Sequence, residues 1–183
     1  MSELNLIVSQ NLDAPQMERL VVRLGAHLAI GKTTSVSHRA EEATSFIRLL
    51  GEHATWAVPL SAAATVYLST LAKHAADATW SGMRRLFSSK EVGPLADVAN
   101  ALADAAGNRE TKVVVQVGLS LPDEHFGSTT IDPSHGPEEV ARVLATFVLH
   151  AEQVRQVIEE ETTAGRGALG PVELVAEGTG ELG

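Results

Sequence analysis

Hydrophobic and polar residues alternate along two stretches of the chain in the way expected of β-strands. Near the amino terminus, Leu4, Leu6 and Val8 occupy every second position. A longer alternation covers 112–121, where the apolar residues are Val113, Val115, Val117, Leu119 and Leu121. Because successive side chains of a strand point to opposite faces of a sheet, each pattern predicts a strand with one buried face. Residues 128–131 are expected to return antiparallel to the longer strand.

Apolar residues at helical spacing predict the first helix. Asp13 followed by Gln16 is a capping-box pattern, and it precedes an apolar stripe that reaches Leu28. We expect Gly31 to end this helix and 33–37 to form a short strand.

Two more helices are predicted where proline stands at a helix start. The first follows Gly93 and Pro94 and ends near Gly107. The second begins at Pro137 and carries a broad apolar stripe as far as Ile158, so it must pack on something, most simply on the strand pair.

Almost all of 38–88 has the pattern of helix, with Pro59 as the expected junction or kink. Residues 54–72 carry no charged side chain, and this length approaches the roughly 20 residues of a membrane-spanning helix. However, Ser and Thr residues dilute the segment and Lys73 follows directly. Because insertion into a bilayer penalises such polar content, a buried core helix is favoured, and a transmembrane helix remains the alternative.

These elements predict an α+β fold in two layers. A small, mostly antiparallel sheet is expected to be packed by amphipathic helices, with a long alanine-rich apolar helix alongside. A chain of 183 residues has the size of one compact domain. We therefore assign 1–163 to a single α+β domain and the glycine-rich 164–183 to a mobile tail.

Composition and charge narrow the classes of function. Cysteine is absent, which excludes disulfide frameworks and thiolate nucleophiles and favours a reducing, cytoplasmic location. No basic region precedes an apolar stretch at the amino terminus, so no secretory signal is expected. The net charge of −9 repels a phosphate backbone, so nucleic acid is not an expected partner.

The sequence contains none of the short motifs that mark catalysis or cofactor binding. The glycine-rich dinucleotide fingerprint, the Gly-x-Ser-x-Gly elbow and the His-Glu-x-x-His pair are all missing. We therefore expect a non-enzymatic protein with no catalytic, cofactor-binding or metal-binding residues and no cofactor. One arrangement is left open, a metal-dependent or acid/base hydrolytic site in which loop residues converge: Asp123, His125, Asp132 and His135.

Three predicted features follow one another along most of 4–149. They are the apolar helix 55–72, the basic pair in Met83-Arg84-Arg85, and the strand pair 112–121 and 128–131. This layout resembles the effector-associated constant component family of bacterial conflict (defence) systems. The resemblance implies an accessory component beside an effector or a signalling enzyme, and it brings no catalytic residues. The chain departs from the layout by an extra helix at 95–106, a longer final helix and the glycine-rich tail.

The function predicted from the sequence is a non-enzymatic adaptor or regulatory component. Its long helix and sheet face are expected to bind a partner protein, or a second copy of the chain in a homo-oligomer. The residues expected to make the contacts are Trp56, Tyr67, Trp80, Arg84 and Arg85. The alternatives are a membrane-associated effector that inserts 54–72 and a hydrolase that uses the His125 and His135 loops.

Overall fold

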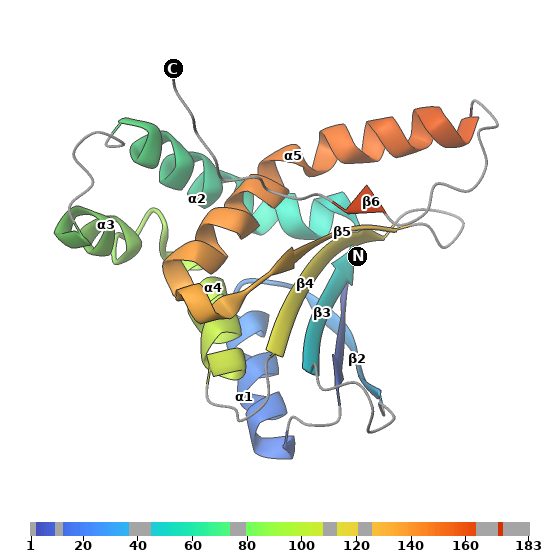
Figure 1. Ribbon diagram of the computed structural model, residues 1–183, viewed down its shortest axis with the longest axis horizontal. Coiled ribbons are helices and arrows are strands. Elements are labelled where there is room, and N and C mark those ends of the chain that lie inside the picture. Colours follow the sequence, from blue (N-terminus) through green and yellow to red (C-terminus); the bar gives the residue numbers. More distant parts are fainter. Residues whose placement is uncertain are drawn as a thin grey trace.

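A mixed β-sheet layered against α-helices forms the protein (Figure 1). The computed structural model describes residues 3–9, 13–36, 45–73, 80–107, 113–120, 126–163 and 172–173. The elements in chain order are β1 (Leu4–Ser9), α1 (Ala14–Gly25), β2 (Ile30–Val36), β3 (Ser45–Gly51), α2 (His53–Lys73), α3 (Trp80–Phe87), α4 (Gly93–Gly107), β4 (Val113–Ser120), β5 (Phe126–Ile131), the 3-10 turn η2 (Pro133–His135), α5 (Pro137–Thr163) and β6 (Val172–Glu173). The predicted α+β class is confirmed.

The strands lie side by side in the order β2-β1-β3-β4-β5-β6. Three neighbouring pairs are parallel, namely β1 with β2, β3 with β4 and β5 with β6, and the other two are antiparallel. The sheet is therefore mixed, which corrects the expectation of a mostly antiparallel sheet. The reason is that helices connect β1 to β2 and β3 to β4, and a connection through helices returns the chain in a parallel direction.

The centre of the sheet contains a strand, β3, inside the stretch 38–88 that was predicted to be helical. This strand pairs with β1 on one side and with β4 on the other. Ile47 and Leu49 on it are buried, whereas Phe46 and Arg48 are half-buried. The helix prediction is wrong here because both faces of β3 carry large apolar side chains, and such a run lacks the clear alternation of a strand with one polar face.

The first helix begins at the predicted cap. The Asp13 carboxylate accepts a hydrogen bond from the backbone N–H of Gln16 at 2.8 Å, and the Gln16 side chain accepts one from the Asp13 N–H at 3.4 Å. The helix ends at Gly25, and Gly31 lies within β2, so the expected stop at Gly31 is wrong. The short strand predicted at 33–37 is β2, which begins earlier.

Removing this cap gives a small, measurable loss of stability. We expect Asp13→Ala to lower the free energy of unfolding by about 1 kcal/mol, because the Gln16 N–H loses its acceptor. Urea unfolding followed by circular dichroism measures the difference. Glu18→Ala, at an exposed position of the same helix, is the matched control and should stay within about 0.5 kcal/mol of wild type.

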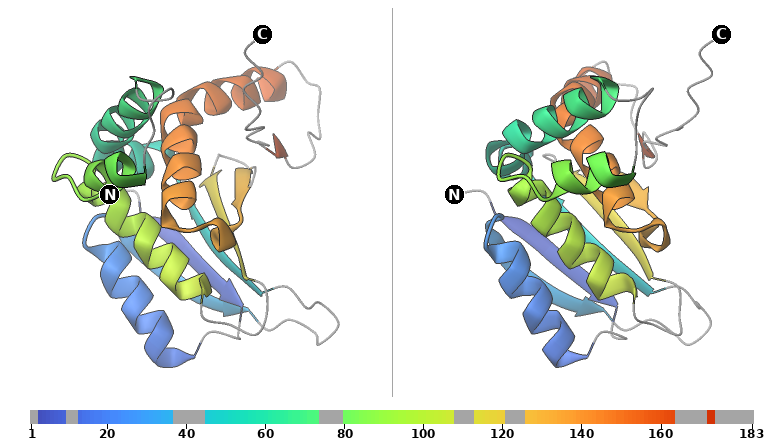
Figure 2. Two further views of the ribbon diagram at one scale, coloured as in Figure 1. Left: turned by 60° about the vertical axis from the view of Figure 1, so that its left-hand side comes forward. Right: turned by 90° about the vertical axis from the view of Figure 1, so that its left-hand side faces the viewer.

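The helices lie on one side of the sheet (Figure 2). Helices α1 and α4 lie side by side and run along the strands, and α2 packs against α5 at one end of the molecule. Every second residue of the central strands enters the core between these layers: Leu4, Leu6, Val8, Ile47, Leu49, Val113, Val115, Val117 and Leu119. Small side chains on α4, including Ala96, Ala99 and Ala101, are buried among them, which lets the neighbouring helices approach closely.

The long apolar helix α2 belongs to this core. Its inward side chains include Leu60, Ala63 and Ala64, and Pro59 lies inside the helix. Within the described part of the chain, no helix combines the length and the apolar character needed to cross a membrane. Of the predicted tail 164–183, the structure describes only the two residues of β6, so its mobility stays a prediction.

Candidate interaction face

One face of the sheet is covered by helices, and no described helix lies over the other (Figure 2). We call this second surface the open face. Its central side chains alternate along the strands with the core residues, are half-buried, and belong neither to the core cluster nor to the residues packed against it. They are the apolar Ile7, Phe46, Leu50 and Val114 and the polar Arg48 and Gln116.

Strand register places Arg48 in the middle of this face. Ile7 lies opposite Arg48 in the antiparallel pair of β1 and β3, and Gln116 lies opposite Arg48 in the parallel pair of β3 and β4. Thr130 of β5 continues the row beyond Gln116. Residues opposed in neighbouring strands project to the same face, so a single cation lies in the centre of a row with an apolar residue on one side and polar residues on the other.

Two neighbours on the open face hold the Arg48 side chain. Its Nε donates a hydrogen bond to Oε1 of Gln116 at 2.7 Å. Its Cζ lies 5.2 Å from the centroid of the Phe46 ring, within the range of a cation–π contact. Among the described residues, no hydrogen bond or ion pair engages the two terminal nitrogens of Arg48. The Arg48 guanidinium is therefore held in one orientation, and its two terminal nitrogens can still donate hydrogen bonds.

Two arginines on the helices, Arg23 and Arg142, are paired with carboxylates, unlike Arg48. Arg23 of α1 lies 2.6 Å from Asp104 of α4. Arg142 of α5 donates two hydrogen bonds to Glu139, at 2.6 and 2.8 Å, and these bonds hold the pKa of Glu139 below its usual value. Within the described residues, Arg48 has no carboxylate partner. An arginine that is half-buried without such a partner is a candidate contact for another molecule.

The aromatic residues predicted as contacts on the long helix lie in the core, which corrects that prediction. Trp56 is fully buried, and its indole N–H donates to the backbone oxygen of Gly118 at 3.2 Å. Tyr67 is 2% exposed, its hydroxyl donates to the backbone oxygen of Glu138 at 3.0 Å, and burial raises the pKa of Tyr67 to about 12. Both side chains anchor α2 to its neighbours, because a buried ring needs a partner for its polar atom.

The remaining predicted contacts lie on α3. Arg84 and Arg85 are exposed in its last turn, where positive charge is favourable beside the negative pole of the helix dipole. Trp80 is the first residue of this helix, and its side chain lies outside the part that the structure describes. A contact role for these three residues stays a prediction.

The predicted loop site is described only in part. Asp123 and His125 lie outside the described residues. Asp132 accepts a hydrogen bond from the Ser134 N–H at 3.0 Å and so caps the turn η2, and His135 is exposed at the end of that turn. In the described ranges, no three His, Cys, Asp or Glu side chains come together as metal ligands. The hydrolytic loop site therefore stays an untested alternative.

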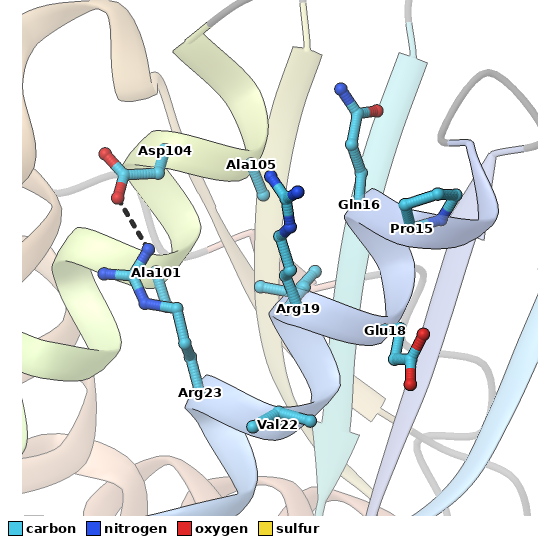
Figure 3. Close-up of a pocket in the computed structure, with 10 residues that line it drawn as sticks. Pro15, Gln16, Glu18, Arg19, Val22, Arg23, Ala101, Asp104 and Ala105 are labelled. Atoms are coloured by element: carbon cyan, nitrogen blue, oxygen red, sulfur yellow. Dashed lines mark hydrogen bonds and ion pairs between the residues drawn. The ribbon is translucent and has the colours of Figure 1, made fainter.

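A groove of about 680 Å³ lies between α1 and α4 (Figure 3). Leu20, Ala101 and Ala105 contribute apolar walls, and the ion pair of Arg23 with Asp104 joins the two helices across it. The groove is therefore explained by the packing of α1 against α4, where the alanine side chains are small and the charges of Arg23 and Asp104 are paired.

A smaller cavity of about 460 Å³ lies where the parallel strands β3 and β4 end. Its walls include His53, at the start of α2, and Arg155 of α5. Nδ1 of His53 lies 3.4 Å from Oε2 of Glu152, and a hydrogen bond from Arg155 lowers the pKa of Glu152. The contact of His53 with Glu152 ties α2 to α5, and Arg155 is paired with Glu152 along α5.

No protein-family model, curated protein or solved structure matches the chain. Function therefore has to be argued from the geometry of this structure. Sequence reasoning missed Phe46, Arg48 and Gln116 as site residues, since β3 was predicted to be helix and its pairing with the predicted strand β4 was therefore not anticipated. The signal in the sequence was the short apolar run of 45–51, in which a single charged residue, Arg48, stands between two apolar residues on each side.

Proposed function

We propose that the protein is a non-enzymatic adaptor or regulatory component that binds a partner protein through the open face of its sheet. The observation that carries this proposal is the set of half-buried apolar side chains on a sheet face that no described helix covers. A contiguous apolar patch around a few polar groups is typical of a protein interaction surface. Aromatic residues and arginine, represented here by Phe46 and Arg48, are enriched where interfaces gain most of their binding energy.

The cellular setting forms a further part of this proposal. The absence of cysteine supports a cytoplasmic location. The layout resemblance to the constant component family supports a place in a bacterial defence-type system, beside an effector or a signalling enzyme. Identification of the bound partner tests this setting directly.

A single lysine on the open face should break the complex. Ile7→Lys places a charge in the apolar part of the open face, next to Arg48 in the strand register. We expect the partner that accompanies the wild-type chain in detergent-free purification to be lost, and complex mass with partner identification measures this. Because the open face is not part of the core, the variant should remain folded by circular dichroism.

Val58→Lys is the matched control, because Val58 is 85% exposed and lies on helix α2, outside the sheet. This control should keep the partner. Loss of the partner with Val58→Lys alone would move the contact to the long helix, and a wild-type chain that purifies as a monomer without any partner would overturn the proposal.

A further inference from the structure

We propose that the partner presents an aspartate or glutamate carboxylate to the terminal nitrogens of Arg48, an inference that rests on the proposed function of the open face. The guanidinium lies in the centre of that face, with Nε bound to Gln116 and its plane near the Phe46 ring. A guanidinium offers donors in a fixed fork that matches a carboxylate, and the fork is most effective when the side chain is already oriented.

Charge on the open face supports an acidic group in the partner. The chain carries a net charge of −9, yet the described strand residues that alternate onto the open face include one acidic residue, Glu173 of β6, which lies opposite Ser128 at the edge of the sheet. Lys32 of β2, opposite Asn5 of β1, adds a second, exposed cation to this face. Arg48 and Lys32 thus outnumber the acidic strand residue of the open face although the whole chain is acidic, and an excess of positive charge selects partners by complementary charge.

The surrounding apolar residues indicate that the carboxylate belongs to a protein. Leu50 and Val114 flank Arg48 and Gln116 along their strands and offer aliphatic surface. Sheets that bind single-stranded nucleic acid use several exposed rings on which bases stack, together with a basic groove. Phe46 is the one aromatic residue among the central positions of this face, and Phe126 of β5 lies in register opposite Ser120 at the end of β4.

The variant Arg48→Lys allows the proposed contact to be tested by chemical cross-linking. This variant keeps the positive charge and introduces a primary amine, which a carbodiimide couples directly to a carboxylate in contact with it, with loss of water. The complex with the partner recovered in the purification above is treated with carbodiimide, and the cross-links are mapped by mass spectrometry. Arg19→Lys, at an exposed position of α1, is the matched control, and the wild-type complex supplies the background from Lys32.

We expect a new amide between position 48 and an aspartate or glutamate of the partner, and none from position 19. An intact complex without a cross-link at position 48 would overturn the inference and leave the proposed function standing. A cross-link from position 48 to a carboxylate of the same chain, or a bound species identified as nucleic acid, would overturn it as well. If no wild-type complex forms, it is the proposed function that fails.

The affinity of the complex gives a second readout. Arg48→Gln removes the charge while keeping a polar side chain of similar reach, and we expect the Kd to rise about 10- to 100-fold, as for a central arginine of an interface. The loss should shrink as salt is raised, because part of the binding is electrostatic. Arg19→Gln should leave the Kd unchanged; an unchanged Kd for Arg48→Gln would contradict the carboxylate contact.

Discussion

Leu49→Lys is expected to abolish folding at 25 °C. Leu49 is fully buried on the covered face of the sheet, opposite Leu6 on one side and Val117 on the other. An ammonium group there would lie among the buried apolar side chains of the core, and burying such a charge costs several kcal/mol. That cost is comparable to the whole stability of a typical domain, about 5–15 kcal/mol. Circular dichroism and the urea midpoint measure the loss.

The next residue along the strand is the matched control. Leu50 is half-buried on the open face, opposite Asn5 of β1 and Gly118 of β4. A lysine at this position can extend its ammonium group into water, so Leu50→Lys should cost no more than about 1 kcal/mol. Equal destabilisation by the two substitutions would mean that the open face is covered in the folded protein, and the interaction proposal would then lose its basis.

The elements that the sequence predicted well are those whose own residues determine them. The capping pattern of Asp13, the clean alternation of 112–121 and the Pro137 start of α5 all depend on neighbours in sequence, and all are present in the structure. The strand β3 depends instead on β1 and β4, which lie on either side of it. Those two neighbours, distant along the chain, select the strand from a segment whose local pattern also suits a helix.

The candidate site was missed for the same reason. Arg48 and Gln116 are 68 positions apart in sequence, and only the parallel pairing of β3 with β4 brings them into contact. For α2, the sequence led to an overestimate of the exposed apolar surface. A long uncharged helix suggested surface left over for a partner, whereas α5 and the sheet cover the side that carries Trp56 and Tyr67. Local sequence cannot show which of two apolar surfaces another element will cover.

Trp56→Ala is expected to lower the free energy of unfolding by about 3–5 kcal/mol, as for the loss of a large buried aromatic side chain. The Trp56 indole lies edge-on to the Phe147 ring, with centroids 5.5 Å apart and an angle of 86° between the planes. It also donates to the backbone oxygen of Gly118 in β4. Its removal leaves a cavity where α2, α5 and the sheet meet. Urea unfolding of the variant and of wild type measures the difference.

Trp56→Phe separates the role of the ring from that of the indole N–H. Phenylalanine fills most of the space but leaves the Gly118 oxygen without its donor, so we expect an intermediate loss of about 1–3 kcal/mol. Because Trp56 is fully buried, this folded variant should bind the partner with wild-type affinity. A contact role, as predicted from the sequence, requires the opposite result, namely weaker binding at unchanged stability. Measuring both quantities on one variant therefore decides whether α2 supports the interaction face from the core or takes part in the contact itself.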